Sequence, residues 1–417
     1  MNPPTGGFFY GGCSSVVERL FVEQDAAGSN PVSHPKMDII DLTKKLVSIP
    51  SYVDGQTDEK EIGKFIYDYL KKFSWLKVSK QPVTNGRFNI IAKDKYPIKL
   101  LLIGHIDTVQ PRQGWKTDPL KPVIKKGKIY GLGATDMKSG LAAILSTLQK
   151  LEKTRGLMLL FYIDEEYDFL GSKKFISEFK GKIEPKLIIS ADGSDLKIGT
   201  GCRGLIEIKF AVEGRSGHAA RPKSGKNAID WSFTAINNLK NYLEKFSTKE
   251  LGKTTINTAF FQGGLNLGQD KNNQLILGQE GNNVADVAKF TVDIRPASLD
   301  LNATKVIKKI ESFLNINGLK LINKKIKHDL SPWLTKKSEI KKIAKIIKKQ
   351  TPIKHFFPND TGFIDVQMFW ETFNKVPCLT FGAGEGKLAH KPNEFVKIKN
   401  LLKTGQVFQK VINELLC

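Results

Sequence analysis

Short apolar runs that end in charged or turn-forming residues alternate along the chain with segments of helical periodicity. The runs lie within residues 99–107 (KLLLIGHID), 156–166 (GLMLLFYIDEE), 186–192 (KLIISAD) and 376–384 (VPCLTFGAG). Between the first two, residues 138–153 (KSGLAAILSTLQKLEK) carry apolar positions at helical spacing. Strands that alternate with helices in this way predict an α/β domain with a mostly parallel, doubly wound sheet.

The middle of the chain has a different pattern. Residues 205–214 (LIEIKFAVEG) alternate apolar and polar positions, which is typical of a half-exposed strand. Further strands are predicted over 254–264, 288–296 and 319–328, and helices over 227–246 and 303–314. This β-α-β-β-α-β order predicts a ferredoxin-like domain inserted into the α/β domain. We therefore expect a catalytic domain of residues 37–202 and 330–417, and an inserted lid or dimerisation domain of residues 203–329.

Residues 1–36 differ in composition from the rest of the chain. They are rich in Gly, Ser and Pro and contain no lysine before Lys36. The piece GGCSSVVERL followed by GSNPVSHP resembles the conceptual translation of a transfer-RNA gene. Our hypothesis is that the protein starts at Met37, which opens a predicted helix (MDIIDLTKKLVSI). A flexible leader is the alternative.

Composition narrows the class of protein. A chain of 417 residues favours two domains. Of its 65 basic residues only eight are arginines. Lysine runs such as KKIAKIIKK (341–349) have the spacing of a solvated helix face. The net charge of +23 therefore does not predict nucleic-acid binding. The four scattered cysteines favour a reducing cytoplasm. No apolar run reaches the ~20 residues of a membrane helix, and the N-terminus does not resemble a signal peptide.

Acidic and imidazole side chains follow the predicted strands. These candidates are His105, Asp107, Asp136, Glu165, Glu166, Asp192 and His390. Taken singly, a strand-end aspartate usually caps a turn, and a lone histidine is usually a surface or core residue. Because ligands gather at the carboxyl ends of the strands in open α/β sheets, the whole set predicts a metal site. Imidazole and carboxylate without thiolate fit zinc, and Asp107 is placed to accept the second imidazole N–H of His105.

Five motifs in order carry a family resemblance. They are HIDTV (105–109), GATDMKSGLAA (133–143), DEE (164–166), SGHAARP (216–222) and AHKPNE (389–394). Together they resemble the di-zinc metallopeptidase and amidohydrolase family that contains acetylornithine deacetylase, succinyl-diaminopimelate desuccinylase, aminoacylase-1 and glutamate carboxypeptidase. The resemblance covers the chain from Met37 onwards, including the inserted domain.

The resemblance implies two Zn²⁺ ions per chain, with Co²⁺ or Mn²⁺ as possible substitutes. Asp136 would bridge the two ions. His105 and Asp192 would complete one site, and Glu166 and His390 would complete the other.

The remaining roles also follow from the resemblance. Glu165 would be the general base that takes a proton from water and passes it to the leaving amine, and Asp107 would orient His105. His218 would reach the active site of the partner subunit in a homodimer and stabilise the oxyanion, although a lid-surface role is the alternative. Arg295 would hold the substrate carboxylate, unless it forms a structural ion pair in the lid. Asn283 would contact substrate or oxyanion.

Two departures from the family leave the substrate open. Asn359, Asp360 and Thr361 stand where relatives often carry a Gly-Thr-rich turn, and ADGSD (191–195) replaces a Glu-Pro-Thr-like stretch. Every expected metal ligand is present. We expect a cytoplasmic amidohydrolase acting on an N-acyl amino acid, with a carboxypeptidase or dipeptidase acting on small peptides as the alternative, and no nucleic-acid or membrane partner. Asp164 has no role that the sequence assigns.

Overall fold

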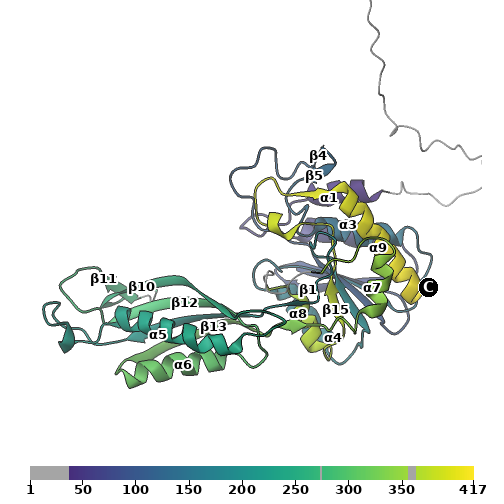
Figure 1. The fold of residues 1–417 in the computed structure, drawn as a ribbon. Helices are drawn as coiled ribbons and strands as arrows, with labels where there is room; N and C mark the ends of the chain where they lie inside the picture. Colours follow the sequence, from purple (N-terminus) through teal and green to yellow (C-terminus); the bar gives the residue numbers. More distant parts are fainter. Residues whose placement is uncertain (1–36, 273–274, 356–362) are drawn as a thin grey trace, which may run out of the picture. The chain divides into compact units, whose positions relative to one another are not determined.

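The computed structural model describes residues 37–272, 275–355 and 363–417 (Figure 1). The largest sheet among these residues contains six strands. The strand order is β1-β2-β6-β3-β7-β15. The strands are β1 (Lys77–Thr84), β2 (Arg87–Lys93), β3 (Leu100–His105), β6 (Leu157–Tyr162), β7 (Leu187–Ser190) and β15 (Cys378–Thr380). Strands β6, β3, β7 and β15 pair in parallel, whereas β2 pairs antiparallel with both β1 and β6. The predicted parallel sheet is confirmed, and the edge pair β1 and β2 was not predicted.

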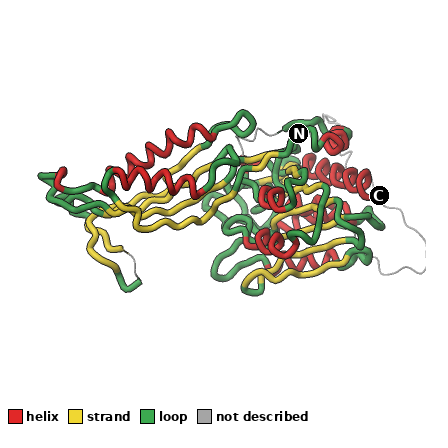
Figure 2. Tube along the Cα trace, turned by 90° about the horizontal axis from the view of Figure 1, so that it is seen from below, coloured by secondary structure: helices red, strands yellow, loops and turns green. Residues whose placement is uncertain are grey.

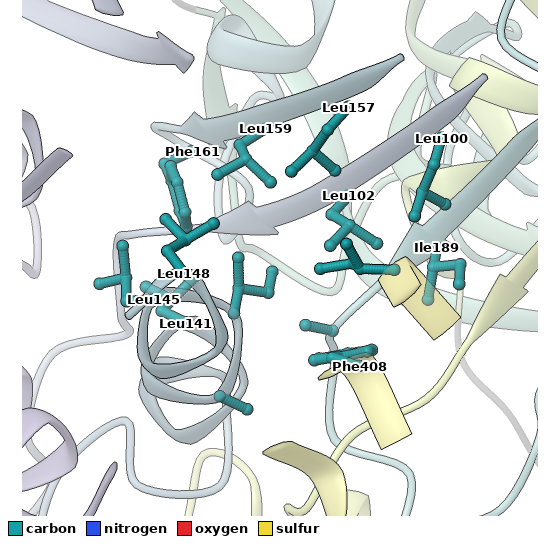
Figure 3. Close-up of a cluster of buried hydrophobic side chains, with 14 of the residues drawn as sticks. Leu100, Leu102, Leu141, Leu145, Leu148, Leu157, Leu159, Phe161, Ile189 and Phe408 are labelled. Atoms are coloured by element: carbon teal, nitrogen blue, oxygen red, sulfur yellow. The ribbon is translucent and has the colours of Figure 1, made fainter. Parts of the chain in front are cut away.

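The central strands are buried on both faces, which explains their unbroken apolar sequences. All six residues of β3 and all six of β6 are buried. Successive side chains point to opposite faces. On one face, Leu102 and Leu159 pack in one cluster with Leu141 and Leu145 of the following helix (Figure 3). The intervening strand residues belong to a second cluster on the other face.

Helices cover both faces of this sheet, as a doubly wound fold requires. The first cluster takes in α1 (Ile39–Val47), α2 (Lys60–Leu70), α3 (Lys138–Leu148), α7 (Lys341–Lys348) and α9 (Ile398–Leu416). The second takes in α4 (Leu170–Phe179) and α8 (Val366–Thr372). The lysines of α7 are exposed while its isoleucines are buried, so the lysine run at 341–349 is a solvated helix face, as predicted.

The second large sheet is antiparallel throughout. Its order is β11-β10-β12-β9-β13. The strands are β9 (Leu205–Glu213), β10 (Thr255–Gln269), β11 (Leu275–Gly278), β12 (Val287–Arg295) and β13 (Lys320–Leu330). Helices α5 (Ala228–Leu243) and α6 (Ala303–Ile316) share one core with these strands, and helices run along the long strands in Figure 2. The predicted ferredoxin-like order is confirmed, with β11 as an additional edge strand.

Two small sheets complete the fold. One pairs β8 (Gly201–Cys202) with β14 (Trp333–Leu334), and the other contains β16 (Phe395–Lys397), β5 (Lys128–Tyr130) and β4 (Val123–Lys125). The β8–β14 pair lies close in sequence to both predicted domain boundaries, which stay a prediction. Residues 1–36 lie outside the described residues, so the hypothesis of a start at Met37 stays a prediction. Among the described helices, none is long and apolar enough to cross a membrane.

The close packing of α3 against the end of β7 gives a stability prediction. A Cβ at Gly140, in the first turn of α3, would lie 2.1 Å from the carbonyl oxygen of Ala191. We expect Gly140→Ala to lower the free energy of unfolding by ~1–3 kcal/mol, because the backbone of one element must move. Urea unfolding measures the change. Gly405→Ala in α9 is the matched control, because a Cβ there meets side chains alone, the terminal methyl of Ile39 at 3.0 Å and Ser146 Oγ at 3.7 Å. Equal losses at the two positions would contradict this interpretation.

Candidate metal centre

The five candidate metal ligands lie at or after the carboxyl ends of strands, or at the start of a helix. His105 is the last residue of β3, Glu166 follows β6, and Asp192 follows β7. Asp136 lies in the turn that leads into α3, and His390 follows β15. Because parallel strands end at the same edge of a sheet, the fold brings these distant segments together.

The five residues form two groups that share Asp136. The groups are His105, Asp136 and Asp192, and Asp136, Glu166 and His390. Within each group, one donor atom from each residue lies within 4.8 Å of the others. His105 Nε2 lies 3.0 Å from Asp136 Oδ1, while His390 Nε2 lies 3.6 Å from Asp136 Oδ2. The two oxygens of Asp136 thus face different imidazoles, which is how a carboxylate that bridges two ions is placed.

Asp107 contacts a residue of each group. Its Oδ1 lies 3.4 Å from His105 Nδ1, and its main-chain oxygen lies nearer, at 3.2 Å. Its Oδ2 accepts a hydrogen bond from the N–H of Glu166 at 3.0 Å. Asp107 therefore lies where it can orient the His105 ring, and it also holds the backbone of Glu166, a contact that the sequence analysis did not predict.

Glu165 lies in an environment that favours its protonated form. Burial raises the pKa of Glu165 well above its ordinary value, and the negative charges of Asp365, Glu166 and Asp136 raise it further, against the opposing effect of His105. A carboxylate with a raised pKa is a stronger proton acceptor than an ordinary one. The environment suits the predicted general base.

The donor set fits divalent metal ions. Burial, and then the charge of Asp136, raise the pKa of Asp192 to about 7. Hydrogen bonds to Asp136 and Glu166 raise the pKa of His390 to about 10. The cluster therefore either takes up protons or binds cations in their place. Imidazole and carboxylate donors in two groups with a shared Asp136 suit a pair of metal ions.

Glu394 supports the turn that presents Asp136. Its carboxylate is buried and accepts hydrogen bonds from the backbone N–H groups of Gly133 at 3.1 Å, Thr135 at 2.6 Å and Asp136 at 3.0 Å. The sequence analysis quoted Glu394 in the motif AHKPNE without assigning it a role. Its place in a motif beside His390 was the available signal.

Asp365 is a further buried carboxylate that the sequence analysis missed. It directly precedes α8 and lies beside Tyr162, and burial raises its pKa to about 6. Its charge acts on both His105 and Glu165. An aspartate at the start of a helix is ordinarily interpreted as a helix cap, so no sequence signal marked Asp365 as part of the site. The neighbouring Asn359, Asp360 and Thr361 lie outside the described residues.

The predicted lid residues His218 and Asn283 lie opposite each other. They form an antiparallel bridge, in which Val284 N–H donates to Gly217 O at 2.7 Å and Ala219 N–H donates to Asn282 O at 3.0 Å. Both side chains are exposed. In the described part of this chain, neither forms a hydrogen bond or ion pair with the five candidate ligands.

Arg295 forms an ion pair within its own strand. Its Nε and Nη2 donate to the two carboxylate oxygens of Asp293 at 2.8 and 3.0 Å. This is the structural ion pair in the lid that the sequence analysis kept as the alternative. A role in substrate binding stays a prediction.

Two ligand groups with a shared carboxylate at the edge of an α/β sheet, beside a half-buried glutamate, are typical of metal-dependent hydrolases. Comparison with known proteins identifies the family. Residues 101–414 match the family described as Peptidase family M20/M25/M40. The chain belongs to this family and is a metal-dependent hydrolase, so the resemblance carried by the five motifs is confirmed.

Curated relatives and solved structures match almost the whole described chain. Over 395 residues it is 29% identical to succinyl-diaminopimelate desuccinylase of Nautilia profundicola, covering 91% of this chain and 100% of the relative. It is 25% identical over 402 residues to acetylornithine deacetylase of Proteus mirabilis, covering 89% and 95%. A tripeptidase structure from Staphylococcus aureus superposes with a TM-score of 0.71 at 23% identity, covering 91% of this chain and 98% of that one. This likeness shows the shared fold.

The shared ligand gives a prediction about metal content. We expect elemental analysis to find about two metal ions per chain in the wild-type protein. His390→Ala should retain about one ion, whereas Asp136→Asn should lose most of both, because Asp136 belongs to both groups. His218→Ala is the control, since this histidine belongs to neither group, and it should keep both ions. Equal metal content in the Asp136 and His390 variants would contradict a bridging role.

Proposed function

We propose that this chain is a zinc-dependent amidohydrolase that cleaves the amide bond of an N-acyl amino acid, as the names of its desuccinylase and deacetylase relatives suggest. The observation that carries the proposal is the pair of donor groups that share Asp136 beside Glu165, whose pKa is raised. The full-length match to the Nautilia profundicola desuccinylase supports the substrate class.

The chain's own residues would divide the work as follows. His105, Asp136 and Asp192 would hold one ion, and Asp136, Glu166 and His390 the other. Bound ions would polarise the amide carbonyl and lower the pKa of water. Glu165 would take a proton from the attacking water, whose oxygen bonds to the acyl carbon. When the C–N bond breaks, Glu165 would pass that proton to the departing amine, and the products are a carboxylate and a free amine.

The lid would supply the recognition of substrate. His218 and Asn283 form an exposed polar pair on facing segments, so both can donate hydrogen bonds to an oxyanion or a substrate carboxyl group. Arg295 would add a positive charge for the substrate carboxylate if its ion pair with Asp293 leaves guanidinium donors available.

The metal and the compartment belong to the same proposal. A donor set of imidazole and carboxylate without thiolate suits zinc, with Co²⁺ or Mn²⁺ as substitutes. Cys202, Cys378 and Cys417 are free thiols among the described residues, which supports a reducing cytoplasm.

The proposal includes a homodimer formed through the lid. Residues 255–264 of β10 pair with β12 along one edge, and no other described strand pairs with that stretch. Phe233 of α5 is half exposed and stacks on Phe261 of β10 with ring centroids 4.3 Å apart. Phe260, on the same strand, is also half exposed. An unpaired strand edge beside exposed aromatic side chains suits docking of a second copy across a two-fold axis.

A substrate screen tests the activity. We expect hydrolysis of N-succinyl or N-acetyl amino acids in preference to dipeptides, and a preference for dipeptides would favour the carboxypeptidase or dipeptidase alternative.

Glu165→Gln should keep its metal but lose turnover by about 10²–10⁴-fold, because the amide side chain cannot accept the proton. Amine release measures the rate, and elemental analysis measures the metal. A Glu165→Gln variant with wild-type turnover would remove Glu165 as the base.

Mixing two inactive variants tests whether His218 acts on the partner subunit. We expect His218→Ala and Glu165→Gln each to be nearly inactive alone. After random subunit exchange, half of the dimers carry one intact site out of two, so activity should return to roughly a quarter of the wild-type rate. If His218 served its own chain, mixing would restore nothing.

The controls for this mixing experiment lie on the lid surface. Adding Phe233→Asp to both chains should abolish the recovery and halve the mass measured by light scattering. Ile316→Asp, at a position of α6 that is 85% exposed, should change neither. Recovery of activity by monomeric chains would contradict the proposal.

A further inference from the structure

Asp164 belongs to a buried ion cluster. Arg87 Nη2 lies 2.7 Å from Asp164 Oδ1, and Arg87 also binds Glu59 through Nε at 2.6 Å and Nη2 at 2.5 Å. The side chains of Glu59, Arg87 and Asp164 are 0%, 10% and 5% exposed. A planar guanidinium that binds one carboxylate with two donors and shares one of them with a second fixes the positions of both.

The remaining polar atoms of Asp164 form hydrogen bonds with the backbone of the loop that follows it. Its Oδ2 accepts hydrogen bonds from the N–H groups of Asp168 at 3.2 Å and Leu170 at 3.3 Å. Its main-chain oxygen accepts from Phe169 N–H at 2.8 Å, and its own N–H donates to Glu59 at 3.2 Å. Asp164 has a φ of 67°, in the left-handed region that costs most non-glycine residues energy. Both ends of the loop are thus tied to one residue, and Glu165 and Glu166 lie between them.

The cluster connects this loop to two other elements. Arg87 is the first residue of β2, and Glu59 directly precedes α2. Strand β2 pairs with β6, whose carboxyl end leads into the loop. The loop is therefore attached to the antiparallel edge of the sheet.

We propose that Glu59, Arg87 and Asp164 form a clamp that positions Glu165 and Glu166 relative to the metal centre. The inference rests on the proposed function, in which Glu165 moves the proton and Glu166 binds the second ion. The three clamp residues are positioning residues, because none of them belongs to either donor group. Their ion pairs hold the loop in a strained turn that its own sequence does not favour.

A cluster that only stabilises the fold is the competing explanation, and the chain contains a matched control. Asp94 is a buried carboxylate at the opposite end of β6. Its Oδ2 accepts hydrogen bonds from Thr154 Oγ1 at 2.6 Å and from the N–H groups of Gly156 and Leu157, both at 2.8 Å. Asp94→Asn removes the charge of a similarly buried carboxylate that is bonded to the first residue of β6, whereas the loop with Glu165 and Glu166 follows the last residue of that strand.

The experiment compares Asp164→Asn, Arg87→Lys and Arg87→Met with Asp94→Asn in the full chain. Hydrogen exchange of the metal-free protein reports on the amides of residues 165–170, and calorimetric titration with Zn²⁺ reports the affinity of the second ion. We expect the clamp variants to exchange these amides faster, to lose about 10–100-fold in affinity for the second ion, and to lose kcat by a similar factor with KM changed little. Asp94→Asn should lower the unfolding temperature without these changes.

The outcomes separate the clamp from the proposed function. Clamp variants that match Asp94→Asn in loop exchange and in affinity for the second ion would overturn the clamp, whatever the enzyme hydrolyses. A metal-loaded wild-type protein that hydrolyses no amide would overturn the proposed function, while loop exchange would still decide the clamp. If Arg87→Met does not fold, Arg87→Lys and Asp164→Asn carry the test, because both keep polar side chains of similar size.

Discussion

The structure depends on keeping several carboxylates together at the carboxyl edge of one sheet. Asp136, Asp192 and Glu166 share this edge with His105 and His390, and each carboxylate raises the cost of ionising its neighbours. The position of Asp136 between the two imidazoles limits that repulsion, and metal ions would remove most of it. Two other contacts hold the backbone near this edge. Helix α3 packs closely against the residue after β7 at Gly140, and Glu394 accepts three backbone hydrogen bonds from the turn with Asp136.

Features that depend on local pattern could be predicted from the sequence. The buried parallel strands are unbroken apolar runs, and residues that directly follow them must lie at the common edge. His105, Glu166 and Asp192 could therefore be placed near one another without a structure. The ferredoxin-like order could be predicted for the same reason, since its strands and helices each carry a clear period.

Features that depend on partners distant in sequence could not be predicted. Arg87 binds Asp164, which lies 77 residues away in the sequence, and Glu394 binds Asp136, which lies 258 residues away. A single sequence contains no local signal for such pairs. Strand β1 is largely exposed, the apolar residues of β2 are interrupted by Asn89, and β4, β5, β14 and β16 are two or three residues long, so none shows a long apolar run. Arg295 is a different case, because its acidic partner Asp293 lies two residues away on the same strand, and the sequence left substrate binding and a structural ion pair open.

Three adjacent acids repel one another, and each has different surroundings: Asp164, Glu165 and Glu166. Asp164 is neutralised by Arg87, Glu166 contacts His390 at 2.9 Å, and Glu165 is left with a raised pKa. Removing one partner of a buried ion pair costs ~3–5 kcal/mol, a large part of a net stability of ~5–15 kcal/mol. The first acid of the run is thus bound by its ion pairs to one position, and this fixed residue allows its neighbour to remain unpaired. A half-buried glutamate that forms no ion pair in the described residues can hold its place only on a loop that other residues keep rigid, and a proton-transfer group has that requirement.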